Sequence, residues 1–169
     1  MKPDGSGVEV FAGGGLDNPV ELAFSQEGDV FGTANLFLNP PRNDAIVHWV
    51  RGGVYPRADQ ANILNEFTRT GELLPAAALL GHVAPAGLTL IQPREGEGSL
   101  TLLHAEFNTR RIMRTTLEPN GASFRGRTEV FISSDTDGLH FTDVLQDADG
   151  SFLLVNTGAW FRIGCPTSG

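Results

Sequence analysis

Residues 139–160, LHFTDVLQDADGSFLLVNTGAW, have the pattern of a β-hairpin. Two apolar runs, Val144-Leu145 and Phe152–Val155, flank the turn Asp147–Gly150. Aspartates in such a turn bond their own backbone, and the glycine accepts a positive φ. The polar residues His140 and Asp143 mark the entrance of the first strand. The stretch therefore predicts an apolar hairpin with a polar entrance.

The same pattern occurs twice more along the chain. When Glu27-Gly28 is placed on Asp149-Gly150, the two stretches align without a gap, and Glu21 falls on Asp143. A third copy carries Gly87 at the place of Glu21. The copies start near residues 18, 84 and 140, and repeats of this length are typical of propellers and similar arrays. We therefore expect one all-β domain over residues 1–169, a partial β-propeller of about three four-stranded antiparallel blades, the last incomplete.

Composition supports short strands joined by turns. The 169 residues are 40% hydrophobic and 19% charged and include 21 glycines and 10 prolines, which favours one turn-rich domain with little helix. We expect a strand at Val8–Ala12 before a Gly13–Gly15 turn, and Ala45–Val50 with Val54-Tyr55 as outer strands of the first blade. The spacing over residues 61–80 predicts a short helix or an irregular excursion.

Charge and cysteine content exclude several classes of function. The net charge of −8 argues against a nucleic-acid partner, because phosphate binding needs a basic face. The single Cys165 excludes an internal disulfide and a thiolate zinc site. No apolar run is long enough to span a membrane, and the N-terminal residues do not form a signal peptide, so the sequence leaves the localisation open.

Several segments together resemble a known family. The segments are His82–Leu88, Leu102–Asn108, and Thr142–Val144 with the Asp147–Gly150 turn, and they resemble the glucose/sorbosone dehydrogenase family of six-bladed propellers. More closely, residues 18–24 and the ending 160–168 look like bacterial "membrane-bound dehydrogenase" propeller proteins. The likeness covers about half of a family propeller. The resemblance implies that related proteins are exported. In the quinoprotein members of the family, it implies pyrroloquinoline quinone (PQQ) bound with calcium at the central funnel.

One departure from the family bears on the cofactor. The resemblance places a pair of arginines just before the aspartate that matches Asp143, where they grip the carboxylates of PQQ, but this chain has His140 and Phe141 there. Arginine suits carboxylates in a way that these residues do not. Six-bladed propellers of similar outline include calcium-dependent lactonases and esterases, whose metal is held by Glu, Asn and Asp.

Oxygen-bearing side chains recur at the entrances and ends of the inner strands. Glu21 and Asp143 start innermost strands, and hard oxygen ligands in such number suit Ca²⁺. The alternative is that both acids cap neighbouring backbone amides. The predicted metal ligands are Glu21, Asn35, Glu106, Asp143 and Asn156.

Histidines supply candidate general bases. His140 and His82 are the predicted catalytic residues, because a neutral imidazole near a bound cation can take the proton of a coordinated water. His104, inside an apolar run, is expected to be a satisfied core histidine, and His48 has no assigned role. No serine, Ser133 and Ser134 included, lies in a Gly-x-Ser-x-Gly elbow, so a serine triad is not favoured.

The function expected from these residues is a Ca²⁺-dependent hydrolase of lactones or related esters, which acts on a small molecule. The alternatives are a PQQ-dependent sugar dehydrogenase and a non-catalytic propeller fragment. Because a three-blade array leaves two apolar flanks open, we also expect a homodimer or higher homo-oligomer that closes the ring.

Overall fold

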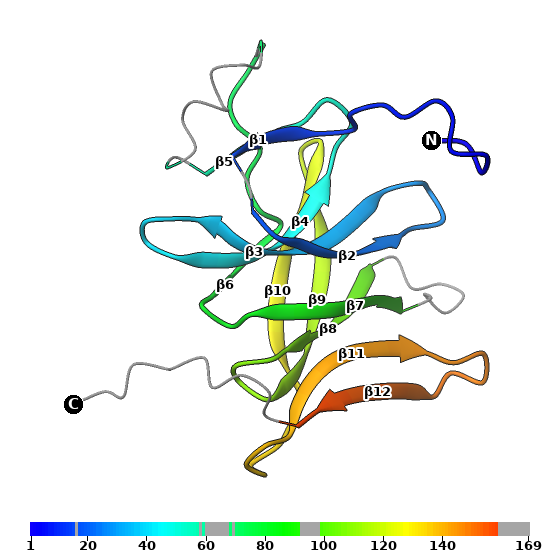
Figure 1. The fold of residues 1–169 in the computed structure, drawn as a ribbon, viewed down its shortest axis with the longest axis vertical. Helices are drawn as coiled ribbons and strands as arrows, with labels where there is room; N and C mark the ends of the chain where they lie inside the picture. Colours follow the sequence, from blue (N-terminus) through cyan, green and yellow to red (C-terminus); the bar gives the residue numbers. More distant parts are fainter. Residues whose placement is uncertain (16, 58, 60–67, 69, 92–98, 159–169) are drawn as a thin grey trace.

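Two four-stranded antiparallel sheets form most of the protein in the computed structural model (Figure 1). The structure describes residues 1–15, 17–57, 59, 68, 70–91 and 99–158. In the first sheet the strands follow one another in the order β2 (Pro19–Phe24), β3 (Val30–Leu38), β4 (Asn43–Trp49) and β6 (Ala78–Gly81). In the second sheet the order is β10 (Ser123–Ser133), β9 (Arg111–Asn120), β8 (Leu100–Glu106) and β7 (Pro85–Ile91).

A hairpin of β11 (His140–Gln146) and β12 (Phe152–Thr157) forms a third unit beside the second sheet (Figure 1). The prediction of an all-β, partial β-propeller is confirmed, and the third blade, expected to be incomplete, has two strands among the described residues. The two turns aligned in the sequence, at Gly28 and Gly150, both have the positive φ expected there, 94° and 86°. No described segment is a helix long and apolar enough to cross a membrane.

The first blade differs from the prediction in its outer strand. Val54-Tyr55 belongs to β5 (Val54–Pro56), which pairs in parallel with β1 (Gly13–Gly15), so the glycines form a strand and not a turn. A Cβ on Gly15 would lie 2.2 Å from the carbonyl oxygen of Arg57, which shows how closely the two backbones approach. Val8–Ala12 pairs with no described strand. The carbonyl of Phe11 accepts the N–H of Gly52 at 2.7 Å, but the segment forms no strand ladder with any of the described residues.

The outer place in the first blade is taken by β6, in which Leu79 lies opposite Ala45 of β4. The expectation of a helix or excursion over residues 61–80 is therefore wrong for Ala78–Leu80, which form a strand. Residues 60–67 and 69 of that segment lie outside the described residues. Hydrogen bonding to β4 decides the strand, because a fourth strand satisfies the otherwise free edge of the sheet.

Apolar side chains of β8 hold the blades together from both sides. Leu102, fully buried, packs with Phe31 and Ile46 of the first blade. Leu103, also fully buried, packs with Phe141 and Val144 of the third unit. Alternate residues of a strand point to opposite faces, so β8 serves two interfaces, and each fully buried leucine stabilises the fold by about 1.5–3 kcal/mol.

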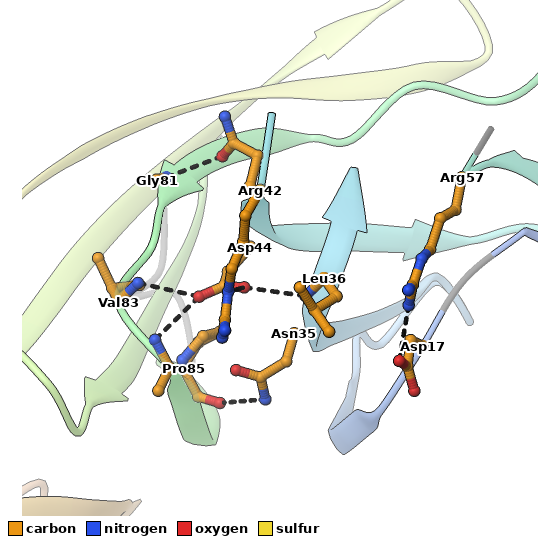
Figure 2. A network of polar contacts seen from close by, with 11 residues as sticks. Asp17, Asn35, Leu36, Arg42, Asp44, Arg57, Gly81, Val83 and Pro85 are labelled. Atoms are coloured by element: carbon orange, nitrogen blue, oxygen red, sulfur yellow. Dashed lines mark hydrogen bonds and ion pairs between the residues drawn. The ribbon is translucent and has the colours of Figure 1, made fainter. Parts of the chain in front are cut away.

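Polar side chains of the first blade bind the backbone that leads into the second (Figure 2). The carboxylate of Asp44, 0% exposed, accepts hydrogen bonds from the N–H groups of Leu36, Val83 and Ala84, each at 2.9 Å. Leu36 and Ala84 have positive φ values of 53° and 51°, which are unfavourable for residues with a Cβ. Asp44 therefore holds two strained residues in place and joins two blades.

Candidate functional site

The entrances of β2, β7 and β11 form the candidate site. These three strands lie side by side along the array (Figure 1). The pairing of each with its neighbour is irregular at the same place, between Pro19 and Leu22, between Pro85 and Leu88, and between Phe141 and Asp143. A bulge in a strand redirects the side chains next to it. The three irregularities therefore occur at equivalent positions of the repeat.

Glu21, Gly87 and Asp143, the three aligned entrance positions, meet at one point. Glu21 accepts a hydrogen bond from the N–H of Leu88 at 3.1 Å. A Cβ on Gly87 would lie 2.0 Å from Oδ1 of Asp143, so that carboxylate occupies the space that a side chain would take. We call Glu21 and Asp143 the acidic pair. The glycine of the middle blade lets the acids of the outer blades approach each other.

The two carboxyl groups of the acidic pair influence each other. Burial raises the pKa of Glu21 above its usual range, and the negative charge of Asp143 and a hydrogen bond to it raise it further, against the effect of the Leu88 N–H. Asp143 also accepts the N–H of Val144 at 2.7 Å. Both acids thus accept backbone hydrogen bonds, as the capping alternative expects, and Glu21 retains a proton more readily than an isolated glutamate.

The raised pKa of Glu21 predicts a pH-dependent gain in stability for Glu21→Gln. A carboxyl group with a folded pKa above its unfolded value stabilises the fold below the unfolded pKa, and this stabilisation is lost as the pH rises through the folded pKa. Glutamine stays neutral and can still accept the Leu88 N–H. We expect Glu21→Gln to raise Tm at pH 8 and to leave it unchanged at pH 4.

The matched control is Glu27→Gln, in the exposed β2–β3 turn. Thermal unfolding of both variants between pH 4 and 8 makes the comparison. An increase in Tm of Glu21→Gln that is equal at both ends of this range would contradict the assigned interaction with Asp143.

The other predicted metal ligands have partners or surroundings of their own. Asn35 donates its side-chain amide to the carbonyl of Pro85 at 3.3 Å (Figure 2). Glu106, 3% exposed, accepts the hydroxyl of Thr109, and Asn156 is exposed on β12 opposite Phe141. Among the described residues no three His, Cys, Asp or Glu side chains are grouped so as to hold a metal ion.

The predicted bases have different environments. Nδ1 of His140 lies 2.7 Å from the carbonyl oxygen of Phe107, and its ring stacks on that phenylalanine at 4.4 Å. A carbonyl only accepts, so Nδ1 carries the proton and neutral His140 has its lone pair on Nε2, which is the nitrogen a base needs. His82 is exposed in the β6–β7 connection.

His104 is a core histidine, as expected, but it is not satisfied. It is 0% exposed, and neither ring nitrogen has a hydrogen-bond partner among the described residues. Nε2 lies 3.6 Å from Oε1 of Glu106, which is a contact too long for a hydrogen bond.

Two residues of this region were missed by sequence reasoning. Gly87 was aligned with Glu21 but given no role, although the absence of its side chain creates the space for Asp143. Asp44 was given no role, although it is the buried acceptor that positions the backbone before β7. The alignment contained a signal for Gly87, since it marked the one entrance position without a side chain, but it contained none for Asp44.

Comparison with solved structures identifies the architecture. A putative oxidoreductase (glucose dehydrogenase) from Thermus thermophilus has a TM-score of 0.61 and 20% identity over 85% of this chain. The PQQ-bound aldose sugar dehydrogenase from Streptomyces coelicolor has a TM-score of 0.56 and 18% identity over 85% of this chain. The fold is that of a partial β-propeller. The chain spans 40% of the length of each of these two structures. No protein-family model and no curated protein sequence matches it.

Proposed function

We propose that this chain is part of a propeller enzyme that oxidises a sugar or a related polyol, with the acidic pair as its proton acceptor. The observation that carries the proposal is the convergence of Glu21 and Asp143 at the entrances of the inner strands. The two similar structures are a putative glucose dehydrogenase and an aldose sugar dehydrogenase, and their activities support the substrate class.

Carboxylates suit a polyhydroxylated substrate because each oxygen accepts a hydrogen bond from a hydroxyl group. When an alcohol is oxidised to a carbonyl, the hydroxyl proton moves to a base. The raised pKa of Glu21 makes its ionised form a stronger base than an ordinary glutamate. In this proposal Glu21 takes the proton, Asp143 orients the hydroxyl, and Nε2 of His140 accepts a second substrate hydroxyl.

The described residues of the site do not fit PQQ by themselves. The carboxylates of that group need cationic partners, whereas the acidic pair is negative and raises the pKa of its own Glu21. In this proposal groups other than the acidic pair would hold the oxidant, a quinone-class cofactor that would take the two electrons of the alcohol while Glu21 takes the proton.

A Ca²⁺-dependent hydrolase of lactones or esters is the second candidate, and the oxygen chemistry of the acidic pair favours it. Glu21 and Asp143 would supply two of the ligand groups around a Ca²⁺ ion, which takes six to eight oxygens. The ion would polarise a carbonyl when bound, and His140 through Nε2 would accept the proton of the attacking water.

One set of assays separates the two functions. Sugar-dependent dye reduction is measured with added PQQ and Ca²⁺, and hydrolysis of a lactone panel is measured with and without a chelator. We expect Glu21→Gln and Asp143→Asn to lower sugar-dependent reduction by at least about 100-fold, since a positioned base contributes that much or more. The control is Glu27→Gln. Lactone hydrolysis that the chelator abolishes would favour the second candidate, and full activity of both variants would contradict a role of the pair.

We also propose that a second copy of the chain covers the open flanks of the array. At the open flank of the first blade, Val20, Leu22 and Phe24 of β2 are exposed. At the open flank of the third unit, Leu153 and Val155 of β12 are exposed. Exposed apolar strands of this kind are aggregation-prone unless covered. We expect sedimentation to give a dimer or larger oligomer at micromolar concentration, and a stable monomer would contradict the proposal.

A further inference from the structure

A second group of polar side chains lies away from the entrances, where the outer part of the first blade meets the second. Nδ1 of His48, on β4, lies 3.0 Å from the hydroxyl oxygen of Ser123 at the start of β10. Nε2 of His48 lies 3.2 Å from Oδ1 of Asp29, in the β2–β3 connection. A serine, a histidine and an aspartate are thus joined in the order that a hydrolytic triad requires.

We propose that Ser123, His48 and Asp29 form a serine-hydrolase centre that cleaves small esters of apolar acids. In this centre Ser123 is the nucleophile, His48 is its general base, and Asp29 orients the imidazole. This centre uses neither the acidic pair nor any metal. Ser123 lacks the second glycine of a Gly-x-Ser-x-Gly elbow, and the three residues are far apart in the chain, so the sequence alone does not indicate this centre.

The imidazole of His48 is held firmly. His48 is 7% exposed and lies opposite Phe31 in the β3–β4 pairing, with the two rings stacked at 5.2 Å. Phe124, next to the serine, packs edge-on against it at 5.2 Å. Asp29 accepts from Nε2–H, so the lone pair of the neutral ring lies on Nδ1, toward Ser123. The lone pair therefore faces the serine, as a general base requires, with the two ring nitrogens exchanged relative to the triad in which Nε2 faces the serine.

The serine borders a space for a substrate. Ser123 lines a cavity of about 500 Å³ whose walls include the apolar residues Val50, Leu74, Pro75 and Phe124. Pockets of this size and lining take small apolar ligands. Arg125 borders the same cavity, so an acyl group with a polar end also fits its chemistry.

The pairing of β10 directs a hydrogen-bond donor to the same edge. Gly126 donates its N–H to the carbonyl of Ala77, across the edge of β10 that faces away from β9. N–H groups two residues apart in a strand point the same way, so the N–H of Phe124 points to this edge too. Its partner in β9, Pro119, has no N–H of its own. The N–H of Phe124, the residue after the nucleophile, is thus available to stabilise the oxyanion that develops during attack.

The reaction balances with these groups and water. Ser123 Oγ attacks the ester carbonyl as its proton passes to Nδ1 of His48. The proton then passes to the leaving alcohol, and an acyl-serine remains. Water attacks the acyl group with His48 again as base, which releases the acid and restores the serine.

The test uses the whole 169-residue chain with a fluorophosphonate probe and p-nitrophenyl butyrate. We expect the probe to label Ser123, located by peptide mass spectrometry, and a chelator to have no effect. Ser123→Ala and His48→Gln should each lower hydrolysis at least about 100-fold, whereas Ser133→Ala, in the same strand, should match the unaltered protein. Asp29→Asn should lower kcat with little change in KM, which a purely structural role would not produce.

Labelling of the unaltered protein decides the matter even if a variant fails to fold. Absence of probe on Ser123 in the folded, unaltered chain would overturn the proposal, as would hydrolysis unchanged in a folded Ser123→Ala. Because these readouts do not involve sugar, lactone or metal, their failure is distinct from a failure of the acidic pair.

Discussion

Asp44→Ala is expected to lower the free energy of unfolding by about 3–5 kcal/mol, the range seen when a buried charged acceptor is removed from its partners. The carboxylate is fully buried, so water cannot replace it. Its loss leaves the N–H groups of Leu36, Val83 and Ala84 without their acceptor. Leu36 and Ala84 are also in a left-handed conformation, and no other carboxylate contact holds them there among the described residues.

Thermal and urea unfolding measure the effect, and for a chain of this size a loss of about 4 kcal/mol lowers Tm by about 10 °C. Asp135→Ala, at an exposed position between β10 and β11, is the control and should stay within about 0.5 kcal/mol of the unaltered protein. The stability of Asp44→Asn should lie between those of Asp44→Ala and Asp135→Ala. Its amide oxygen can still accept a hydrogen bond, whereas its NH₂ group would face backbone N–H donors. Equal stability of Asp44→Ala and the control would contradict the joining role of Asp44.

Gly87→Ala is the second change with a large expected effect. The added Cβ would lie 2.0 Å from Oδ1 and 2.6 Å from Cα of Asp143. The obstacle includes backbone, so a side-chain rotation does not relieve it and β11 must move away from β7. Overpacking of this kind costs about 1–3 kcal/mol and occasionally more, and we expect the upper end of that range.

The displacement also predicts a change that stability alone does not report. If Asp143 moves away, it no longer raises the pKa of Glu21 as strongly, so the carboxyl pKa followed by NMR should fall toward its ordinary value. Gly158→Ala is the control, since a Cβ there meets nothing within 4 Å and the residue has no positive φ. A normal Tm together with an unchanged Glu21 pKa in Gly87→Ala would contradict the close packing of these three positions.

The repeat pattern predicted the architecture because hairpin turns are local. Gly28 and Gly150 adopt the conformation that the turn residues indicated, and the alignment fixed at these turns relates Glu21 to Asp143. The outer strand of the first blade was predicted incorrectly because pairing between distant segments decides it. Nothing in the sequence of Gly13–Gly15 indicates that β5 will lie beside it.

Within the candidate site, the sequence predicted only the residues that the repeat relates to one another. The side-chain amide of Asn35 was expected to be a ligand, but both faces of β3 are covered, and the amide binds the carbonyl of Pro85 in the next blade. His48 had no assigned role because its two partners, Asp29 and Ser123, are 19 and 75 residues away. Packing between blades decides such contacts, and a pattern within one blade does not contain them.

The exposed apolar residues of β2 and β12 bear on how any measurement of this chain is interpreted. In a linear array of repeats, each inner unit is stabilised by two neighbours and each end unit by one. The second blade has neighbours on both sides, whereas the β11–β12 hairpin has one among the described residues. Amide hydrogen exchange should therefore be slowest in β8 and faster in β12. A single melting temperature would average over segments that open at different free energies.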